Sequence, residues 1–166
     1  MNFKKIICSI FVVFLTSTAF AANPVSGGKF KDWEVFTADT DQGKICFAQS
    51  EPKERSPKNF EREPSRLFVT FRPNENVKDE VSVTSGYTFK PSTVNAKSGK
   101  NEYPFFSKEN FAWIEDEKNE QRFINLMKKA SNLMIIANEP KGSQTVDHYS
   151  MMGFTKAYNT AKKSCS

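Results

Sequence analysis

The segment RLFVTFRP, residues 66–73, decides the fold class, because its residues alternate with a period of two. Leu67, Val69 and Phe71 fall on one side of an extended chain, and the intervening side chains fall on the other. This pattern is typical of a β-strand that has one face in a core. The segment is therefore predicted to be a strand.

Similar short segments, rich in β-branched and aromatic residues, recur on both sides of it. In the first of them Trp33 and Val35 are expected to face inward, and Gly86 is expected to break or bulge a later one. Connections this short cannot cross over a sheet, so the strands are expected to pair antiparallel. The predicted strands lie in KFKDWEVFT (29–37), KICFAQS (44–50), DEVSVTSGYTF (79–89), the hairpin TVNAKSGKNEYPFF (93–106), NFAWIED (110–116), the fully buried LMIIA (133–137) and QTVDHYSMM (144–152).

Two segments show the spacing of amphipathic helices instead. The first begins near Asp116 and runs to about residue 131, with acidic residues at its start and lysines at its end, as the helix dipole favours. Its expected apolar stripe is Phe123, Leu126, Met127 and Ala130. The second is a short C-terminal helix in 154–164, whose expected apolar stripe is Phe154, Ala157, Tyr158 and Ala161.

Residues 1–21 are predicted to be a secretory signal peptide. Lys4 and Lys5 precede an apolar run, and Ala19-Phe20-Ala21 gives a small-x-small cleavage site. The run is shorter than the ~20 apolar residues that span a bilayer, so no membrane span is expected after cleavage. The remaining residues, 22–166, suit a single domain.

Cysteine usage points to one disulfide. Of the three cysteines in the chain, Cys8 would leave with the signal peptide, which leaves Cys46 and Cys165. In an exported protein an even number of cysteines favours a bridge, and two cysteines allow only one internal pairing. Two free thiols and a bridge to another chain remain as alternatives at this stage.

The charge of the chain gives no sign of nucleic-acid binding. Loss of Lys4 and Lys5 lowers the formal charge from +5 to +3, and charges of both signs are mixed along the sequence rather than gathered in a basic stripe. The proline-rich segment 51–66 is predicted to be a long solvated loop. Its Arg55, Lys58 and Arg62 are candidate contact residues for a partner, although a tolerated surface insertion would look the same.

The residues needed for most kinds of catalysis are few. His148 is the single histidine, so a zinc site built on histidines lacks ligands, and no metal or other cofactor is expected. Asp147 and His148 are neighbours on a predicted strand and would point to opposite faces, which excludes them as a triad pair. No glycine-rich phosphate loop is present. These features favour binding over catalysis, and no catalytic residue is predicted.

Six segments follow one another along the chain: FKDWEVF, GKICFAQSEP, FVTFRP, EVSVTSGYTF, MKKASNLMIIA and DHYSMMGFTKAY, with a near-terminal cysteine after them. In this order they resemble the invasion-associated locus B family of exported bacterial proteins. The resemblance implies an immunoglobulin-like antiparallel β-sandwich and a periplasmic or envelope-associated location, with no established enzymatic activity. Many relatives carry a further cysteine where this chain has Val35, Phe36 and Thr37, so any second bridge of the family would be missing here.

The sequence therefore predicts a mainly β, immunoglobulin-like sandwich with one inserted helix and a short C-terminal helix. The first functional hypothesis is a non-catalytic exported protein, periplasmic, secreted or associated with the outer membrane. Its partner would be an envelope or host-surface protein or an anionic glycan. The alternatives are a small periplasmic hydrolase with an unrecognised site and a structural or stress-related envelope protein.

Overall fold

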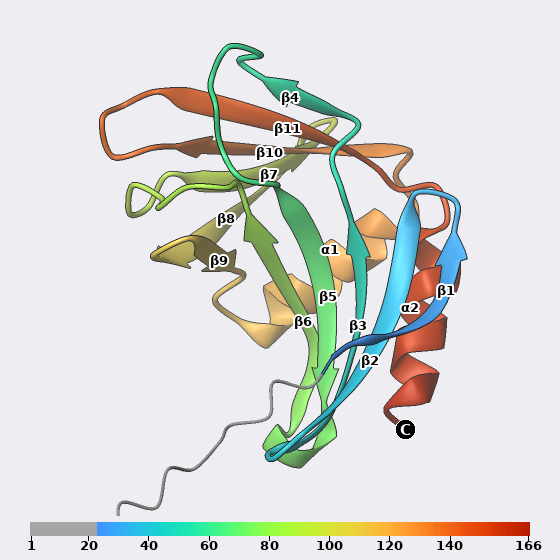
Figure 1. The fold of residues 1–166 in the computed structure, drawn as a ribbon. Helices are drawn as coiled ribbons and strands as arrows, with labels where there is room; N and C mark the ends of the chain where they lie inside the picture. The colour runs from blue at the N-terminus through green and yellow to red at the C-terminus, as the bar shows by residue number, and fades with distance from the viewer. Residues whose placement is uncertain (1–22) are drawn as a thin grey trace, which may run out of the picture.

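The protein is mainly β, as the sequence predicts (Figure 1). The computed structural model describes residues 23–166, so the predicted signal peptide, residues 1–21, lies outside the described residues. The strands of the described chain are β1 (Val25–Phe30), β2 (Trp33–Thr40), β3 (Gly43–Ser50), β4 (Glu54–Ser56), β5 (Arg66–Arg72), β6 (Val77–Thr84), β7 (Val94–Ser98), β8 (Asn101–Lys108), β9 (Phe111–Trp113), β10 (Asn132–Asn138) and β11 (Gln144–Ser150).

All the strand pairs are antiparallel, and they follow the order β1-β2-β3-β5-β6-β9-β8-β7-β10-β11-β4. The sheet turns a corner at β8, whose first half pairs with β7 and whose last residues pair with β9. A strand that belongs to two halves of a sheet is a common way to form such corners. The two halves cross in Figure 1, and they are joined through β8 instead of forming two separate sheets.

Two α-helices of the described chain pack on the sheet. Both lie on the same side of the β2–β3–β5–β6 half (Figure 1): α1 (Glu117–Met127) packs against β6, and α2 (Phe154–Ser164) packs mainly against β2 and β3. The predicted stripe of α2 is confirmed, since its four residues are buried. In α1 the fully buried residues are Phe123, Ile124 and Met127, so Ile124 belongs to the stripe and Leu126 is only partly buried.

A disulfide joins Cys46 to Cys165. Cys46 lies in β3 with its side chain in the core, and Cys165 is the residue that caps the end of α2. The bridge closes a loop with a sequence separation of 119 and holds the end of α2 against the sheet. The pairing predicted from the cysteine count is therefore present.

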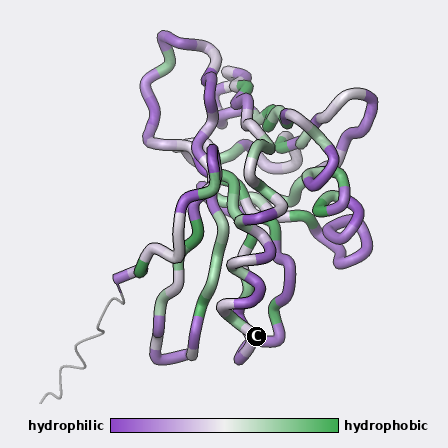
Figure 2. The backbone as a smooth tube through the Cα atoms, turned by 90° about the vertical axis from the view of Figure 1, so that its right-hand side faces the viewer, coloured by the Kyte–Doolittle hydropathy of each residue, from purple (hydrophilic) through white to green (hydrophobic). Residues whose placement is uncertain are grey.

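Two predicted strands have a different form in the structure. The segment 29–37 is a hairpin, because the chain reverses at Lys31, which has a φ of 55°, and Asp32; Trp33 and Val35 are buried as expected. The strand 133–137 is not fully buried: Leu133 and its alternate neighbours face the core, while the residues between them are partly exposed. A continuous apolar run hides this alternation. Figure 2 shows hydrophilic residues at the chain turns.

Candidate binding site

Six aromatic side chains form a continuous row on the outer face of the sheet, away from the helices. We call this row the aromatic strip. It crosses β2, β3, β5, β9 and β8, and neighbouring ring centroids are between 5.4 and 6.4 Å apart. In spatial order its residues are Phe36, Phe47, Phe68, Phe111, Trp113 and Phe106.

The strip follows from side-chain alternation. In β3 and β5 the inward positions hold Ala48, Val69 and other core residues, so Phe47 and Phe68 must point outward. Outward positions of a half-solvated antiparallel sheet are normally polar. Rows of outward aromatic residues are therefore unusual, and contiguous exposed apolar patches commonly mark interaction sites. Phe106, at one end of the strip, is 50% exposed, and the other five rings are partly exposed.

The centre of the strip is hollowed into a recess of about 440 Å³. It is lined by rings of the strip and by hydrogen-bonding side chains, among them the buried Thr70 and Ser82. At its edge Arg72 donates two hydrogen bonds to Glu80, at 2.9 and 3.0 Å. The two charges neutralise each other, so the recess combines apolar rings with polar groups and carries no net charge.

A second recess of about 560 Å³ shares Glu80 and Trp113 with the first and is lined by further carboxylates. Glu120, in the first turn of α1, accepts a hydrogen bond from the backbone N–H of Val81 at 2.6 Å. Partial burial raises the pKa of Glu120 to about 7, and the nearby carboxylates Glu80, Asp79 and Glu117 act in the same direction. A carboxyl group with a pKa of about 7 therefore lies in the same recess as one that is paired with an arginine.

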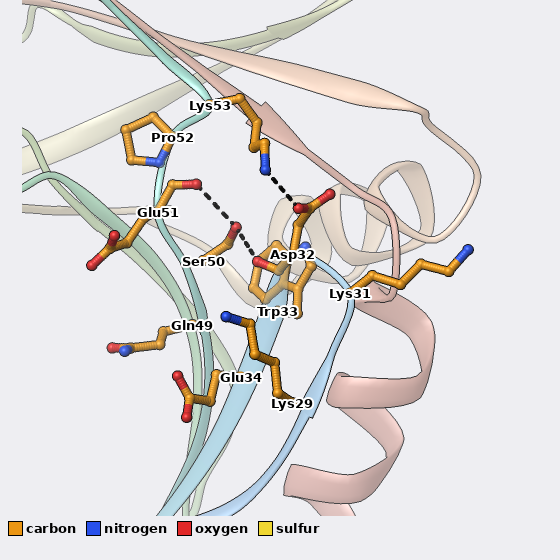
Figure 3. Close-up of a pocket in the computed structure, with 10 residues that line it drawn as sticks. All are labelled: Lys29, Lys31, Asp32, Trp33, Glu34, Gln49, Ser50, Glu51, Pro52 and Lys53. Carbon is orange, nitrogen blue, oxygen red and sulfur yellow. Dashed lines mark hydrogen bonds and ion pairs between the residues drawn. The ribbon is translucent and has the colours of Figure 1, made fainter.

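A third recess, of about 390 Å³, lies where β2 and β3 approach the β1–β2 turn (Figure 3). Lys53 donates a hydrogen bond to Asp32 at 2.8 Å, which holds the pKa of that carboxyl below its usual value. The hydroxyl of Ser50 donates to the backbone oxygen of Asp32 at 2.7 Å, and Lys31 points away from the other labelled side chains (Figure 3). Lysines and carboxylates occur here in equal numbers, so the recess favours neither anions nor cations.

The three predicted contact residues of segment 51–66 are placed very differently. Lys58 is exposed, whereas Arg55 is partly buried in β4 and donates to the carbonyl of Glu63 at 2.5 Å. The side chain of Arg62 is only 2% exposed and forms an ion pair with Asp147, with a second contact of 2.9 Å, so it cannot contact a partner.

Segment 51–66 is also not irregular throughout. Its residues Glu54–Ser56 form β4, which pairs with β11, and the following turns are fixed to the sheet by Arg62 and by a hydrogen bond from Glu63 N–H to the carbonyl of Gly86. Gly86 has a φ of 79°, and a Cβ there would lie 1.9 Å from Glu63 O. The prediction of a solvated loop is therefore wrong for β4 and for Arg62.

The remaining sequence-based predictions concern catalysis and membranes. Asp147 is fully buried while its neighbour His148 is partly exposed, so the two side chains lie on opposite faces of β11, as alternation predicts. In residues 23–166 no group of three or more metal-ligating side chains could hold an ion. Over the same range the structure has no helix of the length and apolar character needed to cross a membrane.

Comparisons with known proteins found no match: none among protein-family models, none among curated proteins and none among solved structures. The functional argument therefore depends on the residues of this chain.

The aromatic strip was not predicted, although its signal is present in the sequence. Phe47 and Phe68 occupy the outward positions of strands whose inward residues are already identified by alternation. The sequence does not give the order of the strands. That order brings the ring of Phe111 in β9 to 6.4 Å from the ring of Phe68 in β5, although the two residues are far apart along the chain.

Proposed function

We propose that the protein is a non-catalytic, exported binding protein, as the resemblance to the invasion-associated locus B family suggests, and that it binds its partner through the aromatic strip. The partner would be a component of the cell envelope or of a host surface. The observation that supports this proposal is the strip itself. Cross-strand aromatic pairs also stabilise a sheet, but six neighbouring rings on one outer face form the kind of contiguous apolar surface that marks interaction sites. The disulfide is in keeping with a location outside the cytoplasm.

The proposal is tested by measuring how much envelope material the protein and its aromatic-strip variants capture. Purified protein is immobilised, incubated with an envelope fraction, and the retained material is measured. Phe47→Thr/Phe68→Thr removes the centre of the strip while keeping residues that favour strands. The matched control is Phe60→Thr, which removes a partly buried ring that packs on Tyr87, away from the strip.

The double variant is expected to retain little envelope material, and the control variant is expected to retain as much as the wild type. Phe106→Thr, at the exposed end of the strip, gives a milder change if the double variant folds poorly. Circular dichroism and the unfolding midpoint establish that each variant is folded. Equal capture by the wild type and by both folded strip variants would contradict the proposal.

Glycoside hydrolysis is a second candidate, favoured by the two carboxyl groups beside the strip. Glu120 has a raised pKa and could serve as an acid, while Glu80, which accepts two hydrogen bonds from Arg72, could serve as a base. The test is the release of reducing sugar from envelope polysaccharide by the wild type, by Glu120→Gln and by Glu80→Gln. Release that both substitutions abolish would support hydrolysis, and no release by the wild type would exclude it.

A further inference from the structure

Under Phe36, Phe47 and Phe68 the sheet offers a ligand only its side chains. β2, β3 and β5 each pair with a neighbour on both sides at these residues, so their backbone N–H and C=O groups are used in strand pairing. An extended peptide usually binds by adding a strand to a free edge. The outermost strands of the sheet are β1 and β4, and neither carries a residue of the strip. The strip is therefore a poor site for an extended peptide.

The size of the strip also argues against a second copy of the chain. Six adjacent strands, about 4.8 Å apart, give a length of about 24 Å. Along the strand direction the strip covers about four residues, or roughly 14 Å. Its area is therefore roughly 340 Å². A stable dimer buries about 800 Å² on each partner. The strip is long and narrow, which suits a linear polymer better than another folded protein.

The chemistry of the strip restricts that polymer further. An aromatic ring carries negative charge on its faces, and the slightly positive C–H groups of a sugar can pack against it. The hydroxyl groups of a sugar need hydrogen-bonding partners, and the largely buried hydroxyls of Thr70 and Ser82 line the recess together with Arg72 and Glu80. The charges of Arg72 and Glu80 cancel, so nothing at the centre of the strip attracts a charged sugar.

We propose that the aromatic strip binds an uncharged stretch of an envelope polysaccharide. A chain of about five sugars would match the strip, with one sugar for each step between neighbouring rings. This inference rests on the proposed function, because it names the partner of the same surface. It differs from recognition of an anionic glycan, because the basic residues that border the Phe106 end of the strip, Lys78 and Lys108, lie among the carboxylates Glu80, Glu117 and Glu120.

The test compares capture from envelope fractions treated in two ways. Periodate cleaves the vicinal diols of sugars and leaves most of a polypeptide intact, while proteinase K digests the proteins and leaves the glycans. Capture by the wild type is expected to be lost after periodate and kept after proteinase K. It is also expected to be the same at low and high salt, since screening affects only charged ligands.

Competition measures the length of chain that is bound. Oligosaccharides released from the envelope fraction are separated by size and added as competitors. Chains of about five units are expected to compete at least tenfold better than disaccharides, and each ring removed from the strip is expected to weaken that competition about tenfold.

Capture that survives periodate but not proteinase K would overturn the glycan inference while leaving the proposed function in place. Capture that falls steeply with salt would overturn the uncharged ligand. Capture that does not depend on the strip at all would contradict the proposed function itself, so the two failures can be distinguished.

Discussion

Replacing Cys165 with alanine is expected to remove at least about a third of the free energy of unfolding of the domain. The bridge from Cys46 closes a loop with a sequence separation of 119, and chain entropy gives about 5 kcal/mol for a loop of that size. The free energy of unfolding of a small domain is about 5–15 kcal/mol. Cys165→Ala should therefore be partly unfolded at about 37 °C, where the oxidised wild type is folded.

Urea unfolding followed by tryptophan fluorescence measures this loss. Trp33 is a suitable reporter, because it is fully buried and packs on Phe154 of α2 at 4.8 Å. The unfolded state without the bridge is more extended, so the slope of the free energy against urea should also rise. The double variant Cys46→Ala/Cys165→Ala controls for the buried free thiol. A loss below about 1 kcal/mol with an unchanged slope would refute the entropic reasoning.

Three other changes are expected to have measurable effects. Asp147→Asn leaves the buried Arg62 without its counter-charge, so the free energy of unfolding measured in urea should fall by about 3–5 kcal/mol. The double variant Arg62→Met/Asp147→Leu leaves no buried charge unpaired, so its free energy of unfolding should fall much less. Because the pKa of Glu120 is raised from 4.5 to about 7 on folding, the folded state binds the proton more tightly. The free energy of unfolding of the wild type should therefore fall as pH rises from about 4.5 to about 7. In Glu120→Gln the free energy of unfolding should fall less over the same pH range, because the titrating carboxyl is absent. Gly153→Ala places a Cβ 1.9 Å from the carbonyl oxygen of Phe30 at a φ of 94°, so the melting temperature should drop sharply; an unchanged melting temperature would show that the backbone there can move.

The parts of the fold that local periodicity determines could be predicted from the sequence. The alternation in 66–73 gave both the strand and its buried face, and the spacing of Phe154 and Tyr158 gave the buried side of α2. The disulfide followed from a count of cysteines and an expected compartment. None of these predictions required knowledge of which strands are neighbours.

The parts that depend on long-range pairing could not be predicted. Arg62 looks like a solvated residue because the segment around it is rich in proline and charge, and its partner Asp147 is 85 residues away. The hairpin at Lys31 was missed because a positive φ at a lysine leaves no mark in the pattern. The aromatic strip needed the strand order, although its individual outward residues were visible as departures from polar alternation.

The disulfide also sets an order of events during the life of the chain. Cys46 is synthesised early, in the third strand, whereas Cys165 follows α2. The native bridge can therefore form only after α2 has been synthesised. A chain that stops before residue 165 has no second thiol for this bridge and stays open. A molecule that contains the Cys46–Cys165 bridge has therefore been synthesised past its last helix, and the end of that helix is joined to β3.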